Sequence, residues 1–83
     1  MSPFVGIDIA KDKFDLVVLS ADQTIGSADF DNTSAGFAKC HRFLKKRKVQ
    51  QGHVCMEATG VYYEGIAHFL HEKGYAVSVV NPL

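Results

Sequence analysis

The sequence predicts an α/β domain in which three strands are followed by two helices, each leading into a further strand. Three observations carry this prediction. Lys13–Ser20 alternates in the period of two that marks a strand with one buried face, Asp31–Ser34 supplies helix-capping residues before an amphipathic segment, and Tyr75–Val80 is a continuous apolar run. The predicted order over residues 1–83 is β-β-β-α-β-α-β, a meander whose two helical crossovers lay parallel strands beside the first strand.

The first three strands are expected to form a meander. Phe4–Ile9 is an apolar run rich in strand-forming residues, and a short turn at Ala10–Asp12 predicts an antiparallel hairpin with the second strand. Thr24–Phe30 gives a third strand, which Gly26 and Ser27 interrupt, so an edge position is expected. The residues that alternate on one side of the second strand are Phe14, Leu16 and Val18.

The first helix is expected to begin after Asp31–Ser34 and to run to about Arg47. On a helical wheel Phe37, Cys40 and Leu44 share one face. The opposite face is basic and carries Lys39, Arg42, Lys45 and Lys46.

The second half of the chain predicts two more strands and a helix. His53–Met56 is a short apolar strand that is expected to end at Glu57, and Thr59 and Gly60 are expected to open a helix over Val61–Lys73. The last strand, Tyr75–Val80, suits a parallel position buried on both faces. The helix residues expected to point inward are Tyr62, Ile66, Phe69 and Leu70, and those expected to point outward are Glu64, His68, His71 and Glu72.

The charges cancel overall but are unevenly distributed. Nine basic and nine acidic residues give a net charge of zero, which offers no overall field for nucleic acid or membrane. Six of the nine bases nevertheless fall within residues 39–48, so one edge should be basic. Cys40 and Cys55 match no zinc-ligand spacing and are expected to be free thiols. With no leader and no long apolar run, a cytoplasmic protein without a membrane segment is expected.

Asp8 is the residue in the first strand that most needs an explanation. An ionised carboxylate buried in an apolar strand costs on the order of several kcal/mol unless it is paired or binds a metal. The alternative is that Asp8 ends the strand and caps the turn. Glu57 stands in an equivalent place beside the fourth strand, and neighbouring parallel strands would bring both carboxylates to one site.

Paired carboxylates at such strand ends predict a metal site. Hard oxygen ligands suit Mg²⁺ or Mn²⁺, and two ions about 3.5 to 4 Å apart can activate a nucleophile and stabilise a leaving oxygen in phosphodiester cleavage. The alternative for Glu57 is that it favours the N-terminus of the following helix. The pair together favours the metal site over the two separate structural roles.

Three motifs resemble those of a known family. Val5–Asp15 (VGIDIAKDKFD), Glu57–Tyr62 (EATGVY) and Val79–Pro82 (VVNP) are similar to the amino-terminal part of the DEDD-type transposases of bacterial insertion sequences, a family that includes the Piv-type DNA invertases. The resemblance covers essentially the whole chain, and three motifs in order at matching spacing make it fairly specific.

The resemblance implies an RNase H-like, RuvC-type catalytic domain truncated at its C-terminus, with Asp8 as the first acid of the tetrad and Glu57 as the second. Residues 1–83 would then form the N-terminal part of that domain. The remaining two aspartates and a domain carrying a nucleophilic serine would lie beyond Leu83. The parent would cut and transfer DNA as a homo-oligomer, guided by RNA in several members, and this chain alone would be inactive.

The basic residues Lys11, Lys39, Arg42, Lys45 and Lys46 could contact a phosphate backbone. A solvated helix face is the competing interpretation, and it is preferred because no aromatic residues are expected to interleave for base stacking. Glu64, His68 and Glu72, with His71 alongside, could in principle hold zinc, but a plain polar face is expected instead.

Two other functional classes fit parts of the sequence. The Gly-Ile-Asp-Ile segment followed by a hairpin also opens actin-like ATPases and sugar kinases, whose phosphate-binding loop needs glycine where this chain has Ala10–Asp12. That class also has no use for Glu57. A non-catalytic interaction module, acting through the edge strand or the basic helix, is the third possibility.

Overall fold

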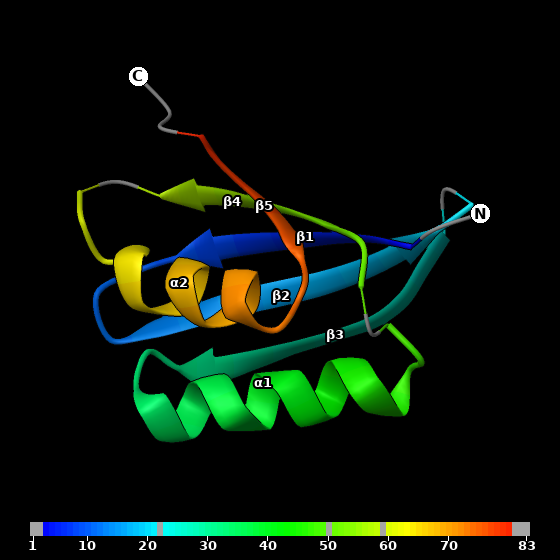
Figure 1. Ribbon diagram of the computed structural model, residues 1–83, viewed down its shortest axis with the longest axis horizontal. Coiled ribbons are helices and arrows are strands. Elements are labelled where there is room, and N and C mark those ends of the chain that lie inside the picture. The colour runs from blue at the N-terminus through cyan, green and yellow to red at the C-terminus, as the bar shows by residue number, and fades with distance from the viewer. Residues whose placement is uncertain (1–2, 22, 50, 59, 81–83) are drawn as a thin grey trace.

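The computed structural model describes residues 3–21, 23–49, 51–58 and 60–80. A five-stranded sheet carries two helices on one of its faces (Figure 1). The elements, in chain order, are β1 (Phe4–Ile9), β2 (Lys13–Ser20), β3 (Gln23–Asp31), α1 (Ser34–Lys46), β4 (His53–Ala58), α2 (Glu64–Glu72) and β5 (Ala76–Val80). The predicted β-β-β-α-β-α-β order is therefore confirmed.

The strand order is β3-β2-β1-β4-β5, so β1 lies at the centre of the sheet. It pairs antiparallel with β2 through the short turn and parallel with β4 through the α1 crossover. β3 is an edge strand, as its interrupted sequence predicts, and its register with β2 shifts between Val18 and Leu19. This bulge adds twist at the edge of the sheet.

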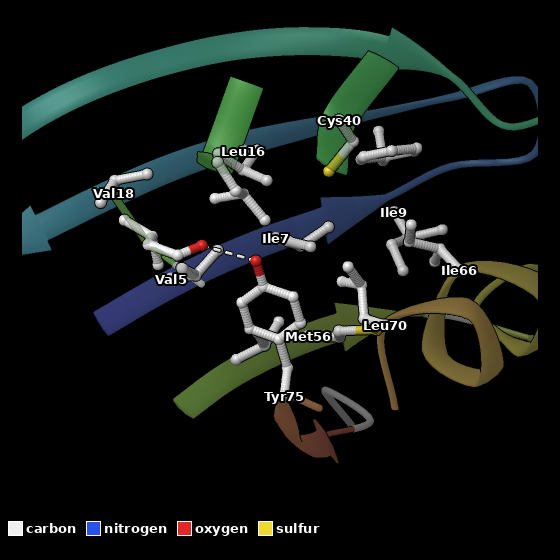
Figure 2. Packing of buried hydrophobic residues seen from close by; sticks show 14 of the residues in the cluster. Val5, Ile7, Ile9, Leu16, Val18, Cys40, Met56, Ile66, Leu70 and Tyr75 are labelled. Carbon is white, nitrogen blue, oxygen red and sulfur yellow. Dashed lines mark hydrogen bonds between the residues drawn. The ribbon is translucent and has the colours of Figure 1, made fainter. Parts of the chain in front are cut away.

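The core lies between the sheet and the two helices. The period of two in β1 sends Val5, Ile7 and Ile9 toward the helices, and each is at most 4% exposed. Figure 2 shows these side chains meeting residues of both helices, such as Cys40 and Leu70. Inward-facing side chains of β2, β4 and both helices complete the cluster, which includes Phe14, Leu16, Val18, Leu44, Val54, Met56, Ala58 and Ile66.

α1 begins and ends close to where its sequence predicts. Thr33 is the N-cap residue, and its side-chain oxygen accepts a hydrogen bond from the Gly36 amide at 3.1 Å. Such a cap satisfies one of the free amides at the helix start. Cys40 and Leu44 are buried and Phe37 is partly buried, which confirms the apolar face. Arg47 is the C-cap residue, so the predicted end is one residue late.

The predicted start of α2 and the predicted position of Tyr62 are wrong. Gly60 takes a positive φ of 73°, and turns fill residues 60–63, so the helix starts at Glu64 rather than at Val61. Tyr62 is consequently 45% exposed instead of pointing inward, whereas Tyr63 packs partly against the core. Residue 59, which was expected to open the helix, lies outside the described residues.

The prediction that the last strand is buried on both faces is also wrong. β5 starts at Ala76, one residue later than predicted, and pairs only with β4, which makes it the second edge of the sheet. Val79 is 38% exposed and Val80 is 49% exposed. A continuous apolar run is typical of a central parallel strand, but strand order depends on pairing with distant segments that composition does not reveal.

Tyr75 ties the end of α2 to the segment that follows α1. Its side chain is 1% exposed, and its hydroxyl donates a hydrogen bond of 2.5 Å to the backbone carbonyl of Val49, drawn as a dashed line in Figure 2. Burial, helped by the neighbouring Cys40, raises the pKa of the Tyr75 hydroxyl above its ordinary value, so the hydroxyl is a neutral donor at physiological pH.

We expect Tyr75→Phe to lower the free energy of unfolding by about 1 to 3 kcal/mol, because it leaves the buried Val49 carbonyl without its donor. Urea denaturation measures this loss. Ser78→Ala is the matched control, since it also removes one hydroxyl but lies on the exposed side of the sheet near His53. A control that loses as much stability as Tyr75→Phe would contradict the assigned role of the hydrogen bond.

Candidate metal site on the open face of the sheet

Asp8 and Glu57 occupy adjacent positions on neighbouring strands. β1 and β4 are parallel and in register, and Asp8 pairs with Glu57. Neighbouring strands lie about 4.8 Å apart, so the two side chains leave the same face of the sheet side by side. Both residues are exposed on the face opposite the helices. The predicted adjacency of the two carboxylates is therefore what the strand register gives.

Two details of the prediction are wrong. Asp8 is exposed rather than buried, because Ile7 and Ile9 take the inward positions and the alternation of the strand sends the carboxylate into solvent. Glu57 lies inside β4, which continues to Ala58, instead of following the strand. Asp8 therefore needs no partner to offset burial, whereas its pairing with Glu57 follows from the strand register alone.

Asp15 is a neighbour that sequence reasoning missed. It pairs with Asp8 across the antiparallel β1–β2 ladder and is also exposed. The signal was present, because a hairpin that turns at Ala10–Asp12 places Asp15 opposite Asp8 on the face away from Phe14 and Leu16. Asp8 therefore has an acidic neighbour on each side, Asp15 on β2 and Glu57 on β4.

The acidic row continues to Asp29 on β3, which pairs with Asp15. Asp29 forms an ion pair with Lys13, whose Nζ lies 2.8 Å from Asp29 Oδ2. The hydrogen bond from Lys13 holds the pKa of Asp29 below its ordinary value, and the same bond raises the pKa of Lys13. Both side chains are more than half exposed, so this is a surface ion pair, in which Lys13 already binds the Asp29 carboxylate.

A hollow of about 450 Å³ connects the carboxylates with an apolar part of the same face. Gly6 makes room for it, since a Cβ atom there would lie 3.3 Å from Val17 Cγ1. The described part of the chain places no helix over this face. The lining residues are Phe4, Gly6, Ile7, Asp8, Asp15, Leu16, Val17, Ser27, Cys55 and Glu57.

The donors of Asp8 and Glu57 are carboxylate oxygens, which are the ligands that Mg²⁺ and Mn²⁺ prefer. The chemistry of the pair therefore fits such an ion. Among the described residues, however, no three His, Cys, Asp or Glu side chains gather closely enough to hold a metal. The pair can form part of a metal site, and the remaining ligands would have to be water, substrate phosphate or residues from elsewhere.

Asn32 connects three segments just beyond the strand ends near this pair: its own segment after β3, the β1–β2 turn and the segment before α2. Its side-chain amide donates to the carbonyl oxygens of Ala10 at 3.1 Å, Lys11 at 3.3 Å and Tyr62 at 2.9 Å. Its backbone amide donates to the Asp12 carbonyl at 2.9 Å. The turn that follows Asp8 is thus held against the segment that precedes α2.

The other predicted site residues lie elsewhere. Lys11 is exposed in the β1–β2 turn, close in sequence to Asp8. The bases of α1, namely Lys39, Arg42, Lys45 and Lys46, are exposed on the helix side of the sheet, away from the carboxylates. His68 Nε2 lies 3.1 Å from Glu72 Oε1 as an exposed pair on α2.

The two cysteines are free and lie in different environments. Cys40 is buried, and burial raises the pKa of its thiol to about 12, which keeps the thiol protonated. Cys55 is half-buried on the open face. Within the described residues, neither helix is long and apolar enough to cross a membrane.

Comparison with known sequences decides the family. The sequence model of the IS110-type DEDD transposases, described as a transposase, matches residues 5–83. The chain belongs to this transposase family. The pilin gene-inverting protein of Moraxella bovis is 35% identical to it over 82 residues, which make up 96% of this chain and 25% of that protein. The chain thus spans about a quarter of the length of the curated relatives it matches.

Solved structures confirm the predicted RuvC-type fold for this member of the transposase family. RuvC from T. thermophilus, in complex with a Holliday junction substrate, has a TM-score of 0.68 at 12% identity, covering 99% of this chain and 66% of RuvC. A Bacteroides thetaiotaomicron protein with an actin-like ATPase fold has a TM-score of 0.72 at 13% identity, covering 93% and 32%. Both likenesses concern the fold alone, and the family match favours the transposase over the actin-like ATPase.

We expect Asn32→Ala to loosen the turn that follows β1 and its contact with the segment before α2. Losing hydrogen bonds to three carbonyl groups should lower the free energy of unfolding by about 1 to 2 kcal/mol. It should also shift the NMR signals of the amides of Lys11, Asp12 and Tyr63. Gln51→Ala is the control, because it truncates an exposed side chain at the opposite end of β4. Unchanged amide signals around Lys11 in the Asn32 variant would show that the ties do not position this turn.

Proposed function

We propose that the chain is the N-terminal part of the catalytic domain of a DNA transposase or invertase, in which Asp8 and Glu57 hold divalent metal for strand cleavage and transfer. The observation that carries this proposal is the in-register pair of carboxylates on β1 and β4 within a chain that matches the transposase family over residues 5–83. The name of the Moraxella relative, a pilin gene-inverting protein, supports DNA recombination as the activity of the whole protein.

The two carboxylates suit metal binding because their oxygens are hard ligands and because they stand on neighbouring strands of the sheet. Bound Mg²⁺ or Mn²⁺, two ions in the complete site, would polarise the scissile phosphate and lower the pKa of a bound water or hydroxyl. Asp8 and Glu57 would offer oxygen ligands from neighbouring strands, which hold them more rigidly than loops could. Further ligands would come from parts of the whole protein outside these 83 residues.

DNA is the partner that this proposal requires, and we assign Lys11 a role in holding it. The Lys11 ammonium belongs to the turn that begins after β1, which Asn32 holds in position. A lysine there can contact the phosphate backbone near the carboxylates and release condensed counterions. We further propose that the whole protein acts in the cytoplasm as a homo-oligomer and that a guide RNA is bound through its other parts.

The actin-like fold does not favour ATP binding by this chain. A phosphate-binding loop after the first strand needs glycine so that its backbone can approach the phosphates, and the turn here is Ala10-Lys11-Asp12. Glu57 would also have no part in such a site. Saturable ATP binding by the whole protein, lost in a variant of this turn, would favour the ATPase class instead.

We expect Asp8→Asn and Glu57→Gln each to reduce DNA cleavage by the whole recombinase more than about a hundredfold, since even groups that only orient metal ligands are worth 10- to 100-fold. Each substitution keeps the size of the side chain and removes its charge. DNA binding, measured by fluorescence anisotropy, should remain largely intact. Glu72→Gln is the matched control, because its carboxylate lies on α2 beside His68. Full cleavage activity in either active-site variant would refute the assignment.

We also expect Mn²⁺ to broaden the backbone amide NMR signals near Asp8 and Glu57 together when it is titrated into the 83-residue chain. The paramagnetic ion broadens signals of nearby nuclei, and two protein ligands should give weak affinity, on the order of millimolar. The signals of His68 and Glu72 act as the internal control. Broadening at only one of the two strands would contradict a shared site.

A further inference from the structure

The groove between β3 and α1 combines basic and aromatic side chains. It encloses about 330 Å³ and is lined by Phe30, Lys39, Arg42, Phe43, Lys46 and Arg47. From the sequence alone a solvated helix face is favoured, because no aromatic rings are expected to be available for base stacking. Phe43 already stands among the basic residues of α1, and folding brings a second ring, Phe30 of the distant strand β3, to the same hollow.

Arg47 is held in place before any ligand arrives. Its guanidinium carbon lies 3.7 Å from the centroid of the Phe43 ring, and Phe30 meets the same ring edge-on at 5.7 Å. Gly26 on β3 makes room for the arginine, because a Cβ atom there would lie 2.2 Å from Arg47 Nε. A guanidinium fixed in this way loses less conformational freedom when it binds an anion.

Interaction with the helix dipole explains only some of the basic residues of α1. Lys45 and Lys46 lie in the last turn of α1, where they interact favourably with the helix dipole. Lys39 and Arg42 lie nearer the middle of the helix, where the dipole gives them no such benefit. Among the described residues, no carboxylate forms an ion pair with any base of this groove. The groove therefore presents positive charge to solvent.

The aromatic rings indicate how a ligand would be bound. The guanidinium of Arg47 covers the face of Phe43, and Phe30 packs against both Phe43 and Phe14. Because Arg47 covers one face of Phe43, we assign the cations of the groove to phosphate contacts, which carry no sequence information. A pre-placed planar guanidinium beside further cations suits the phosphate backbone of a duplex.

The groove also lies on the other side of the sheet from the proposed metal site. Gly26 and Phe30 face α1, whereas Asp29 lies in the carboxylate row of the open face. The five-stranded sheet lies between α1 and the open face that carries the carboxylates (Figure 1). A duplex bound along α1 would therefore be a different segment from the one held at Asp8 and Glu57.

We propose that the groove lined by Phe30, Lys39, Arg42, Phe43, Lys46 and Arg47 binds the phosphate backbone of a second duplex DNA segment, without sequence preference. This inference rests on the proposed recombinase function, since recombination brings two DNA segments together. It assigns to the helix side of the sheet a positioning role that is distinct from cleavage.

The test is the salt dependence of DNA binding by the whole recombinase, measured by anisotropy with a labelled 20-base-pair duplex and with an RNA hairpin of equal length. Arg42→Gln/Lys46→Gln should weaken duplex binding about tenfold or more and lower the slope of log affinity against log salt by about 1.8. Lys48→Gln/Lys73→Gln removes the same charge outside the groove and should change the slope little. Circular dichroism checks that each variant folds.

Arg47→Gln and Gly26→Ala test the placement of the arginine. Each substitution should weaken duplex binding. The double variant should bind the duplex as tightly as Arg47→Gln alone, because both substitutions act on one guanidinium. Equal losses in the groove and control pairs, or additive effects of Gly26→Ala and Arg47→Gln, would overturn the proposal. A loss confined to the RNA hairpin would overturn the assignment to DNA.

Cleavage of a single duplex separates this proposal from the proposed function. At DNA concentrations that saturate the active site, Arg42→Gln/Lys46→Gln should retain single-duplex cleavage and lose joining between two duplexes, whereas Asp8→Asn should lose cleavage and retain the salt slope. Retained joining in the groove variant would overturn the second-duplex role even if Asp8 and Glu57 prove catalytic.

Discussion

The in-register pairing of β1 with β2 on one side and with β4 on the other is the interaction on which the rest of the structure depends. Since side chains alternate along a strand, one register decides both faces at once. Val5, Ile7 and Ile9 enter the core, and the intervening Asp8 meets Asp15 and Glu57 on the open face. A slip of one residue in β4 would separate the carboxylates and expose the apolar side chains of that strand.

The sheet divides two kinds of chemistry between its faces. The open face gathers acids, whose oxygens suit hard cations, and it leaves them exposed to solvent. The helix side gathers the bases of α1 around an arginine that Phe43 and Gly26 hold in place. Opposite charges on opposite sides of a thin domain avoid the mutual neutralisation that a mixed surface would produce, although the chain as a whole has zero net charge.

The fold by itself does not distinguish the functional classes that share it. Both RuvC and an actin-like ATPase-fold protein superpose on most of this chain at low sequence identity. What distinguishes them are side chains at particular places, such as Glu57 opposite Asp8 and the absence of glycine from the turn at Ala10–Asp12. Function in this fold is therefore carried by a few residues on a common scaffold.

The sequence by itself determined the features that depend on local interactions. The alternation of β2, the Thr33 cap and apolar face of α1, and the basic cluster of residues 39–48 could all be predicted from near neighbours along the chain. The resemblance of its motifs to the transposase family also singled out Asp8 and Glu57. Each of these depends on short-range periodicity, capping or motif identity.

Only the tertiary structure decided the features that depend on partners distant in the chain. It placed Asp8 in solvent, continued β4 beyond Glu57, put β5 at an edge and brought Asp15 beside Asp8. It also brought Phe30 and Gly26 of β3 to the bases of α1. Strand order, register and groove formation arise from pairing between segments far apart in sequence. Local propensity does not determine which of these segments pair.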